Sequence, residues 1–232
     1  MERITAILLA AGSGKRMNST VHKQYMMLAE KPMLYYALKA FDESAVTDIV
    51  LVTGVGEITY CKQEIVDRYR IHKVRAIVEG GRERYHSVYA GLKAAGDSDY
   101  VLIHDGARPL VTEDIIARSI ETAKAYGACV VGMPVKDTIK VVGTDGFAKE
   151  TPERKKLWQV QTPQSFSYPL ILEAYEKVVA LGDDTVTDDA MVLERITGQQ
   201  VRVIEGSYRN IKITTPEDLL VAEAYLKDVA KK

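Results

Sequence analysis

The chain has 232 residues, of which 47% are hydrophobic and 27% charged, and its formal net charge is −1. This length and composition predict a single α/β domain over residues 1–232 and argue against disorder. The near-neutral charge gives no support to nucleic-acid binding, and no apolar run approaches the roughly 20 residues of a membrane span. Cys61 and Cys129 lie far apart and favour neither a disulfide framework nor a zinc site, so we expect a cytoplasmic protein.

Strand-like and helix-like segments alternate over the first part of the chain. Strands are expected over residues 4–9, 49–53, 74–79, 100–104 and 128–133, and helices over 33–41, 57–69, 83–95 and 113–126. This order predicts right-handed crossovers and a mostly parallel, twisted sheet covered by helices on both faces, a Rossmann-like three-layer sandwich. Ligands bind such sheets outside the carboxyl ends of the strands.

The alternation stops after residue 133. Residues 135–158 hold two short alternating runs around an Asp-Gly pair and then the charged stretch PERKKLW, which predicts a projecting β-arm. A projecting hairpin buries little surface by itself, so we expect it to pack against a second copy in a homodimer; a solvated excursion is the alternative. Helices are then expected over 168–181 and 188–197, a strand over 201–204, and a last helix that begins near Thr215 and Pro216.

The first expected strand runs into a loop of small residues, in the stretch ILLAAGSGKRM at residues 7–17. The spacing of its glycines fits neither the phosphate loop of the NTPases nor the dinucleotide fingerprint. Small residues still leave the main-chain N–H groups open to a polyphosphate, which the cations that follow would neutralise. The predicted phosphate-binding residues are Ala10, Ala11, Gly12, Ser13, Gly14, Lys15 and Arg16.

Asp105, in the stretch VLIHDGARP, comes directly after an apolar strand and is expected beside this loop. A carboxylate at that place is suited to hold Mg²⁺, which prefers oxygen ligands. The alternative is a turn-forming Asp-Gly pair. Arg108 adds a cation on the same rim.

Other candidates lie elsewhere in the chain. Lys23 follows the loop closely, and Lys212 is expected in a short apolar strand, where a buried ammonium needs an anionic partner unless the strand is at an edge. The glycine turn in EGGRERYHSV could let Gly81 and the nearby Ser87 approach the edge of a flat base. Groups suited to a second, phosphorylated substrate are Lys136, Thr138, Thr162 and Thr187, although hydroxyls at turns usually bond locally.

The candidates are mostly cations with one carboxylate, and no nucleophile is paired with a base. The four histidines have no metal-ligand spacing, and no G-x-S-x-G motif accompanies them. Such a set favours phosphoryl-type transfer, in which positioning and charge stabilisation supply nearly all the catalysis. A phosphate acceptor is already anionic and needs no general base. We therefore expect its oxygen to attack the α-phosphorus of a nucleoside triphosphate and to release pyrophosphate.

Together these stretches resemble the 2-C-methyl-D-erythritol 4-phosphate cytidylyltransferase family of the non-mevalonate isoprenoid pathway. The matching pieces, in order along nearly the whole chain, are LLAAGSGKRM, KQY, EGGRERYHSV, IHDGARP, PVKDTIK, LWQVQTPQSF, VTDDA and NIKITTPEDL. The resemblance implies CTP and 2-C-methyl-D-erythritol 4-phosphate as substrates, Mg²⁺ as cofactor, and a homodimer with interlocking arms.

The resemblance also implies roles for particular residues. It assigns Arg16, Lys23 and Lys212 to the triphosphate and the transition state, and Asp105 to the metal. It places Gly81 and Ser87 at the cytosine and its ribose. Around the acceptor it places Arg108, Thr138, Thr162, Thr187 and, on an arm from the other subunit, Arg154. One position departs from the family pattern: many relatives have an acidic residue before NIK, where this chain has Arg209, which puts any role for a second carboxylate there in doubt.

Three alternative functions fit the sequence less well than this cytidylyltransferase activity. Ribitol-5-phosphate cytidylyltransferases usually have Ala-Gly-Gly where this chain has Ala10-Ala11-Gly12, and Thr where it has Gln161. A nicotinamide-dependent oxidoreductase is disfavoured because the third glycine of its fingerprint is missing. A non-catalytic nucleotide-binding module would not need Asp105 and Lys212 together.

Overall fold

A computed structural model describes residues 2–12, 17, 22–182 and 185–229. Its centre is a seven-stranded sheet with the strand order β11-β7-β10-β6-β1-β4-β5. The strands are β1 (Ile4–Ala10), β4 (Asp48–Thr53), β5 (Val74–Glu79), β6 (Tyr100–Asp105), β7 (Ala128–Pro134), β10 (Trp158–Ser167) and β11 (Arg202–Glu205). All neighbouring pairs are parallel except those of β10, which is antiparallel to both β6 and β7. The predicted mostly parallel sheet is confirmed.

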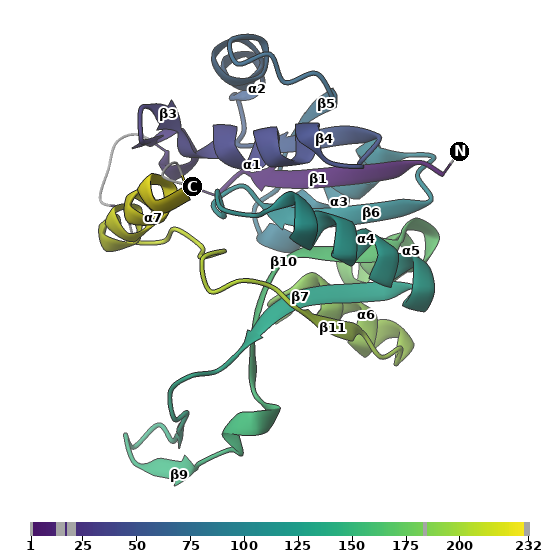
Figure 1. Ribbon diagram of the computed structural model, residues 1–232. Helices are drawn as coiled ribbons and strands as arrows, with labels where there is room; N and C mark the ends of the chain where they lie inside the picture. Colours follow the sequence, from purple (N-terminus) through teal and green to yellow (C-terminus); the bar gives the residue numbers. More distant parts are fainter. Residues whose placement is uncertain (1, 13–16, 18–21, 183–184, 230–232) are drawn as a thin grey trace.

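Helices cover both faces of this sheet, as the alternating sequence predicts (Figure 1). The helices are α1 (Met33–Glu43), α2 (Ile58–Tyr60), α3 (Arg84–Ala95), α4 (Glu113–Tyr126), α5 (Tyr168–Leu181), α6 (Asp189–Thr197) and α7 (Pro216–Val229). One apolar cluster lies between the sheet and α1 and α4, and a second lies between the sheet and α3, α5 and α6. Strand β1 contributes to both, because Leu8 belongs to the first cluster and Ile7 to the second.

Local sequence explains where several helices begin and end. In α4 the hydroxyl of Thr112 accepts a hydrogen bond from the Ile115 amide at 3.4 Å, and two acids occupy the first turn. The helix ends at Gly127, whose φ of 78° suits glycine. The predicted helix at 57–69 divides into α2 and a π-helical turn, η3 (Cys61–Asp67).

Strand β10 was not predicted, although it lies in the middle of the sheet. It contains Pro163, which has no N–H to donate, and its pairing with β7 shifts register between Val160 and Gln164. Its middle is also polar, yet Thr162, Gln164 and Ser165 are at most 3% exposed. A second correction concerns Lys212, which was expected in a strand. Residues 211–214 belong to no strand or helix, and the segment is held by a hydrogen bond from the Ile213 amide to the Ala107 carbonyl, 2.8 Å long.

The arm leaves the sheet between β7 and β10 and extends well away from it (Figure 1). Its tip is the two-stranded hairpin of β8 (Val141–Val142) and β9 (Ala148–Glu150), and a 3₁₀ turn, η4 (Arg154–Lys156), precedes β10. A smaller hairpin, β2 (Met27–Leu28) and β3 (Lys31–Pro32), precedes α1. No helix in the described part of the chain is long and apolar enough to span a membrane.

Candidate active site

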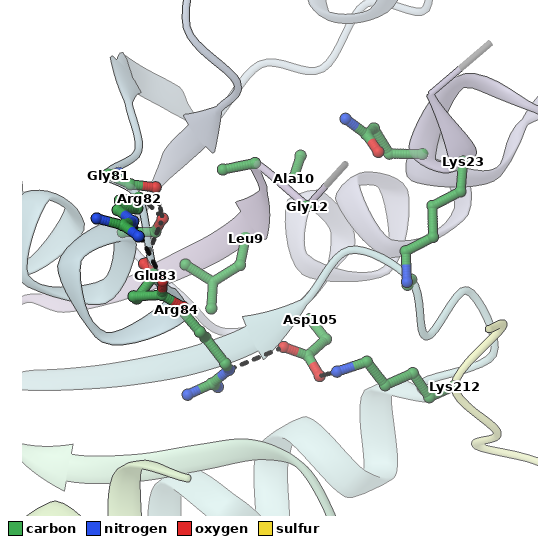
Figure 2. A pocket seen from close by; sticks show the side chains of 14 residues that line it. Leu9, Ala10, Gly12, Lys23, Gly81, Arg82, Glu83, Arg84, Asp105 and Lys212 are labelled. Atoms are coloured by element: carbon green, nitrogen blue, oxygen red, sulfur yellow. Dashed lines mark hydrogen bonds and ion pairs between the residues drawn. The ribbon is translucent and has the colours of Figure 1, made fainter. Parts of the chain in front are cut away.

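A pocket of about 340 Å³ opens where β1 and β6 end, within the size range of small-molecule sites. Figure 2 shows Gly81, Arg82, Glu83 and Arg84 along one side, Lys23 and Lys212 on the other, and Asp105 between them. The sequence-predicted residues that line it are Ala10, Ala11, Gly12, Lys23, Gly81, Ser87, Asp105 and Lys212. The fold therefore brings Ala10, near the start of the chain, together with Lys212, near its end. Their individual roles stay predictions.

The turn before α3 can approach the β1 loop because it consists of glycine. A Cβ on Gly80 would lie 2.6 Å from the Ala11 Cβ and 2.6 Å from the Ser87 hydroxyl, and one on Gly81 would lie 2.4 Å from the His86 Cβ. A side chain at position 80 would force the two loops apart, and one at position 81 would collide with the start of α3. The Ser87 hydroxyl also accepts a hydrogen bond from the Gly81 amide at 3.2 Å. At Gly81 the wall of the pocket is therefore backbone without a side chain, beside the side chains of the residues that follow it.

Asp105 is the most constrained acid in the pocket. It is 8% exposed, its Oδ2 lies 2.7 Å from the Lys212 Nζ, and its Oδ1 lies 3.5 Å from the Arg84 Nε. Burial by itself would raise the pKa of this carboxyl, but the charges of Arg84, Lys212 and Arg108 outweigh it and hold the pKa well below its usual range. Asp105 is therefore an anion at neutral pH.

A buried chain of hydrogen bonds holds the backbone of Asp105. Its amide donates to the Thr162 hydroxyl oxygen at 3.1 Å, and that hydroxyl lies 3.0 Å from the His104 Nδ1. The His104 Nε2 lies 3.1 Å from the Arg108 carbonyl, so its proton is on Nε2 and Nδ1 accepts from Thr162. Burial lowers the pKa of His104 to about 4 and keeps it neutral. Thr162, predicted to bind the acceptor, supports Asp105 in this structure and does not line the pocket.

A second network, missed from the sequence, anchors Arg84. Its guanidinium makes two hydrogen bonds, 2.7 and 2.8 Å long, to Asp189, whose side chain is fully buried. The Tyr175 hydroxyl donates to the same carboxylate, and the Gln164 Oε1 accepts from the Asp189 and Ala190 amides. Both partners of the ion pair stand in stretches that carry the family resemblance, but no spacing rule pairs residues 105 positions apart.

The remaining predicted residues lie outside this pocket. Arg108 donates to the Asn210 carbonyl at 2.8 Å, and its buried Nε has no partner. The Thr187 hydroxyl is exposed and lies 3.4 Å from the Met191 sulfur. Thr138 and Arg154 belong to the arm, where Arg154 donates to the Lys136 carbonyl at 3.0 Å. The predicted phosphate-binding residues Ser13, Gly14, Lys15 and Arg16 lie outside the described residues.

Comparison with known proteins matches residues 4–228 to the family model of 2-C-methyl-D-erythritol 4-phosphate cytidylyltransferase, IspD. The chain belongs to this family. A protein of that name from Lachnoclostridium phytofermentans is 50% identical over 228 residues, covering 98% of each chain. Another from Alkaliphilus oremlandii is 52% identical over 229 residues, covering 98% of this chain and 96% of its own.

Solved structures agree with this family membership. The crystal structure of 4-diphosphocytidyl-2C-methyl-D-erythritol synthase from Anaerococcus prevotii matches with a TM-score of 0.85 and 33% identity, over 97% of this chain and 96% of that one. The 2-C-methyl-D-erythritol 4-phosphate cytidylyltransferase of Thermus thermophilus matches with a TM-score of 0.78 and 28% identity, over 95% and 98% of the two chains. The resemblance found in the sequence motifs is confirmed.

Proposed function

We propose that this chain transfers CMP from CTP to 2-C-methyl-D-erythritol 4-phosphate, giving 4-diphosphocytidyl-2-C-methyl-D-erythritol and pyrophosphate. The observation that carries this proposal is the pocket itself. It combines exposed backbone at Gly81, where the neighbouring Gly80 allows a close approach to Ala11, with the ammonium groups of Lys23 and Lys212 and the carboxylate of Asp105. Family membership supports the choice of substrates.

The reaction needs charge stabilisation more than acid–base chemistry. The phosphate oxygen of the acceptor attacks the α-phosphorus of CTP, and the bond to the β-phosphate oxygen breaks, so negative charge grows on the transferred group and on the leaving pyrophosphate. Lys23 and Lys212 reach the pocket from the same side and are placed to offset this charge. His104 fits a mechanism without a general base, because it is fully buried and both of its ring nitrogens have partners.

Mg²⁺ is the metal that this site would use. Among the described residues, no three His, Cys, Asp or Glu side chains gather into a metal cluster. Mg²⁺ is commonly held by one or two carboxylates together with substrate phosphates, and Asp105 supplies such a carboxylate at the pocket wall. The donor set therefore fits, with Asp105 as the protein ligand. The ion would neutralise charge on the triphosphate when bound.

The Asp105 assignment is tested by Asp105→Asn. We expect a weaker response of activity to Mg²⁺, because the amide is a poorer ligand than the carboxylate. A Mg²⁺ titration that matches the parent protein would remove Asp105 from the metal site. Circular dichroism checks that the variant keeps its fold.

We further propose that the chain acts as a homodimer in which residues 135–158 complete the active site of the other subunit. The arm exposes apolar side chains that solvent does not favour: Val142 is 56% and Phe147 72% exposed. The arm extends away from the sheet (Figure 1), and its residues Thr138 and Arg154 do not line the pocket of their own chain. Both observations support an arm that packs on a partner and carries Arg154 to the partner's acceptor phosphate.

Mixing inactive variants tests the shared site. Lys23→Ala and Arg154→Ala homodimers are each expected to be nearly inactive. Subunit exchange gives about half heterodimers, each with one site carrying both lesions and one carrying none, so about a quarter of all sites regain parental activity. If Arg154 served its own chain, mixing would restore nothing. Subunit exchange is verified separately with differently labelled chains.

The substrate assignment is tested by measuring pyrophosphate release from CTP with each sugar phosphate offered separately. We expect release with 2-C-methyl-D-erythritol 4-phosphate and little with ribitol 5-phosphate. Preference for ribitol 5-phosphate would assign the chain to the sister activity. Binding of CTP without pyrophosphate release with either sugar phosphate would indicate a non-catalytic nucleotide-binding module.

A further inference from the structure

The carboxylate of Glu57, which does not line the pocket, contacts the turn that carries Lys23. Glu57 lies in the loop between β4 and α2, and its side chain is 16% exposed. Its Oε2 accepts hydrogen bonds from the Tyr25 hydroxyl at 2.8 Å and the Gly54 amide at 3.1 Å, and lies 3.5 Å from the Gln24 Nε2. Its Oε1 pairs with the His22 Nδ1.

These contacts are not explained by the local helix. Glu57 occupies the position before α2 but makes no side-chain capping bond to it, and α2 itself has only three residues. An acid that stabilised the helix would accept from the helix amides that follow it. The Glu57 carboxylate instead faces back to Gly54 and across to residues 22–25.

The turn η2 (Lys23–Tyr25) is fixed on this carboxylate through the residues on either side of Lys23. Tyr25 is 9% exposed, and its hydroxyl lies between Glu57 and the Cys61 sulfur, 2.9 Å away. Burial raises the pKa of Tyr25, so the phenol stays protonated and donates to the carboxylate at neutral pH. The Lys23 side chain instead lines the pocket (Figure 2), and its Nζ donates to the Ile213 carbonyl at 3.3 Å.

We propose that Glu57 is a positioning residue for Lys23. It joins the loop after β4 to the turn after β1, and so sets where the Lys23 ammonium enters the pocket. This rests on the proposed function, which assigns Lys23 to charge that develops during transfer. An interaction realised in the transition state is sensitive to small displacements, and a shift of about 1 Å can lower a rate by roughly a hundredfold.

The kinetic test compares variants of Glu57 with a matched control. We expect Glu57→Ala to lower kcat by roughly tenfold to a hundredfold and to change KM for CTP much less. Glu57→Gln keeps an oxygen that accepts from Tyr25 and Gly54, and is expected to restore most of kcat. Glu64→Ala is the control, because this acid lies on the same segment but is 47% exposed and pairs with Arg68; it is expected to match the parent.

A double-mutant cycle separates positioning from general loss of stability. If Glu57 acts through Lys23, adding Glu57→Ala to Lys23→Ala lowers kcat no further. Equal kcat in Glu57→Ala and the parent, or a double variant whose loss is the product of the two single losses, would overturn the proposal. Where Glu57→Ala fails to fold, Tyr25→Phe removes one bond from the same carboxylate and is expected to lower kcat severalfold in the same pattern.

Amide hydrogen exchange gives a readout that does not depend on activity. The Tyr25 and Met26 amides donate within the turn, to the His22 and Lys23 carbonyls. We expect Glu57→Ala, and not Glu64→Ala, to speed their exchange. Unchanged exchange would overturn the positioning role whatever the enzyme does. Absence of pyrophosphate release from the parent would instead overturn the proposed function.

Discussion

Thr162 offers a sharp test of how the site is supported. The substitution Thr162→Val removes the hydroxyl at nearly constant volume. In the structure this hydroxyl accepts from the Asp105 amide and donates to the His104 Nδ1, and Thr162 is 3% exposed. Water therefore has little access to replace it. The substitution leaves two buried polar groups without a partner.

The expected loss follows from those two groups. A buried donor or acceptor left unpaired costs about 1–3 kcal/mol, so the free energy of unfolding should fall by about 2–6 kcal/mol. This is a large share of the roughly 5–15 kcal/mol by which a typical domain is stable. Thr162→Ser keeps the hydroxyl and loses only a methyl group, for which about 1 kcal/mol is expected.

Urea unfolding followed by circular dichroism measures both variants at one protein concentration. A free energy of unfolding for Thr162→Val within about 0.5 kcal/mol of that of the parent would refute this role, because ordinary surface substitutions have effects of that size. The sequence-based prediction gives a different outcome: a Thr162 that contacts the acceptor would raise KM for 2-C-methyl-D-erythritol 4-phosphate without lowering stability. The two measurements together decide which role the hydroxyl has.

Three further predictions concern catalysis, base recognition and the thiols. Lys23→Ala and Lys212→Ala should lower kcat more than they raise KM, because both cations are assigned to charge that develops during transfer; steady-state kinetics in which KM alone rises would contradict this. CTP should be preferred to UTP by roughly tenfold to a hundredfold in kcat/KM, since main-chain groups near Gly81 can match only one hydrogen-bonding pattern at the pyrimidine edge. Equal kcat/KM for the two nucleotides would show that this site does not recognise the base. Burial raises the pKa of Cys61 and of Cys129 to about 11, and both are 0% exposed. Neither should react with DTNB at pH 8 until the protein is unfolded, and rapid release of one equivalent of the chromophore from the native protein would refute their burial.

Local signals in the sequence predict much of this fold. The helix at 113–126 is found at its observed bounds because a capping threonine, two acids and a terminal glycine mark its ends. The strands of the parallel part are found because they are mostly apolar segments between helices, and β1 and β4 are almost entirely buried. Strand β10 escapes such reasoning, since its proline and polar residues are typical of loops. Its buried polar groups are tolerated because tertiary partners such as Asp105, Asp188 and the α6 amides bond to them.

The sequence predicts those site residues that lie in recognisable motifs. It does not predict the ion pairs that these residues make in the fold. Sequence motifs placed Asp105, Lys23 and Lys212 near a glycine loop, and the pocket contains all three. They did not reveal that Arg84 and Lys212 share the carboxylate of Asp105, or that Glu57 supports the turn of Lys23. Such contacts join residues far apart in the chain and depend on how the loops meet.

The two cations on Asp105 differ in how firmly the fold holds them. Arg84 makes a paired contact with Asp189, whose side chain is fully buried, and drawing it away would leave that acid without its cation, which costs about 3–5 kcal/mol. Lys212 has a side chain that is 37% exposed and meets Asp105 at 2.7 Å on a segment outside the sheet. We therefore expect an arriving triphosphate to compete more easily for Lys212 than for Arg84. On this view Arg84 keeps Asp105 charged and in place, and we expect Lys212 to be the cation that turns to the phosphates. Both are basic residues within motifs, so only their partners in the fold distinguish them.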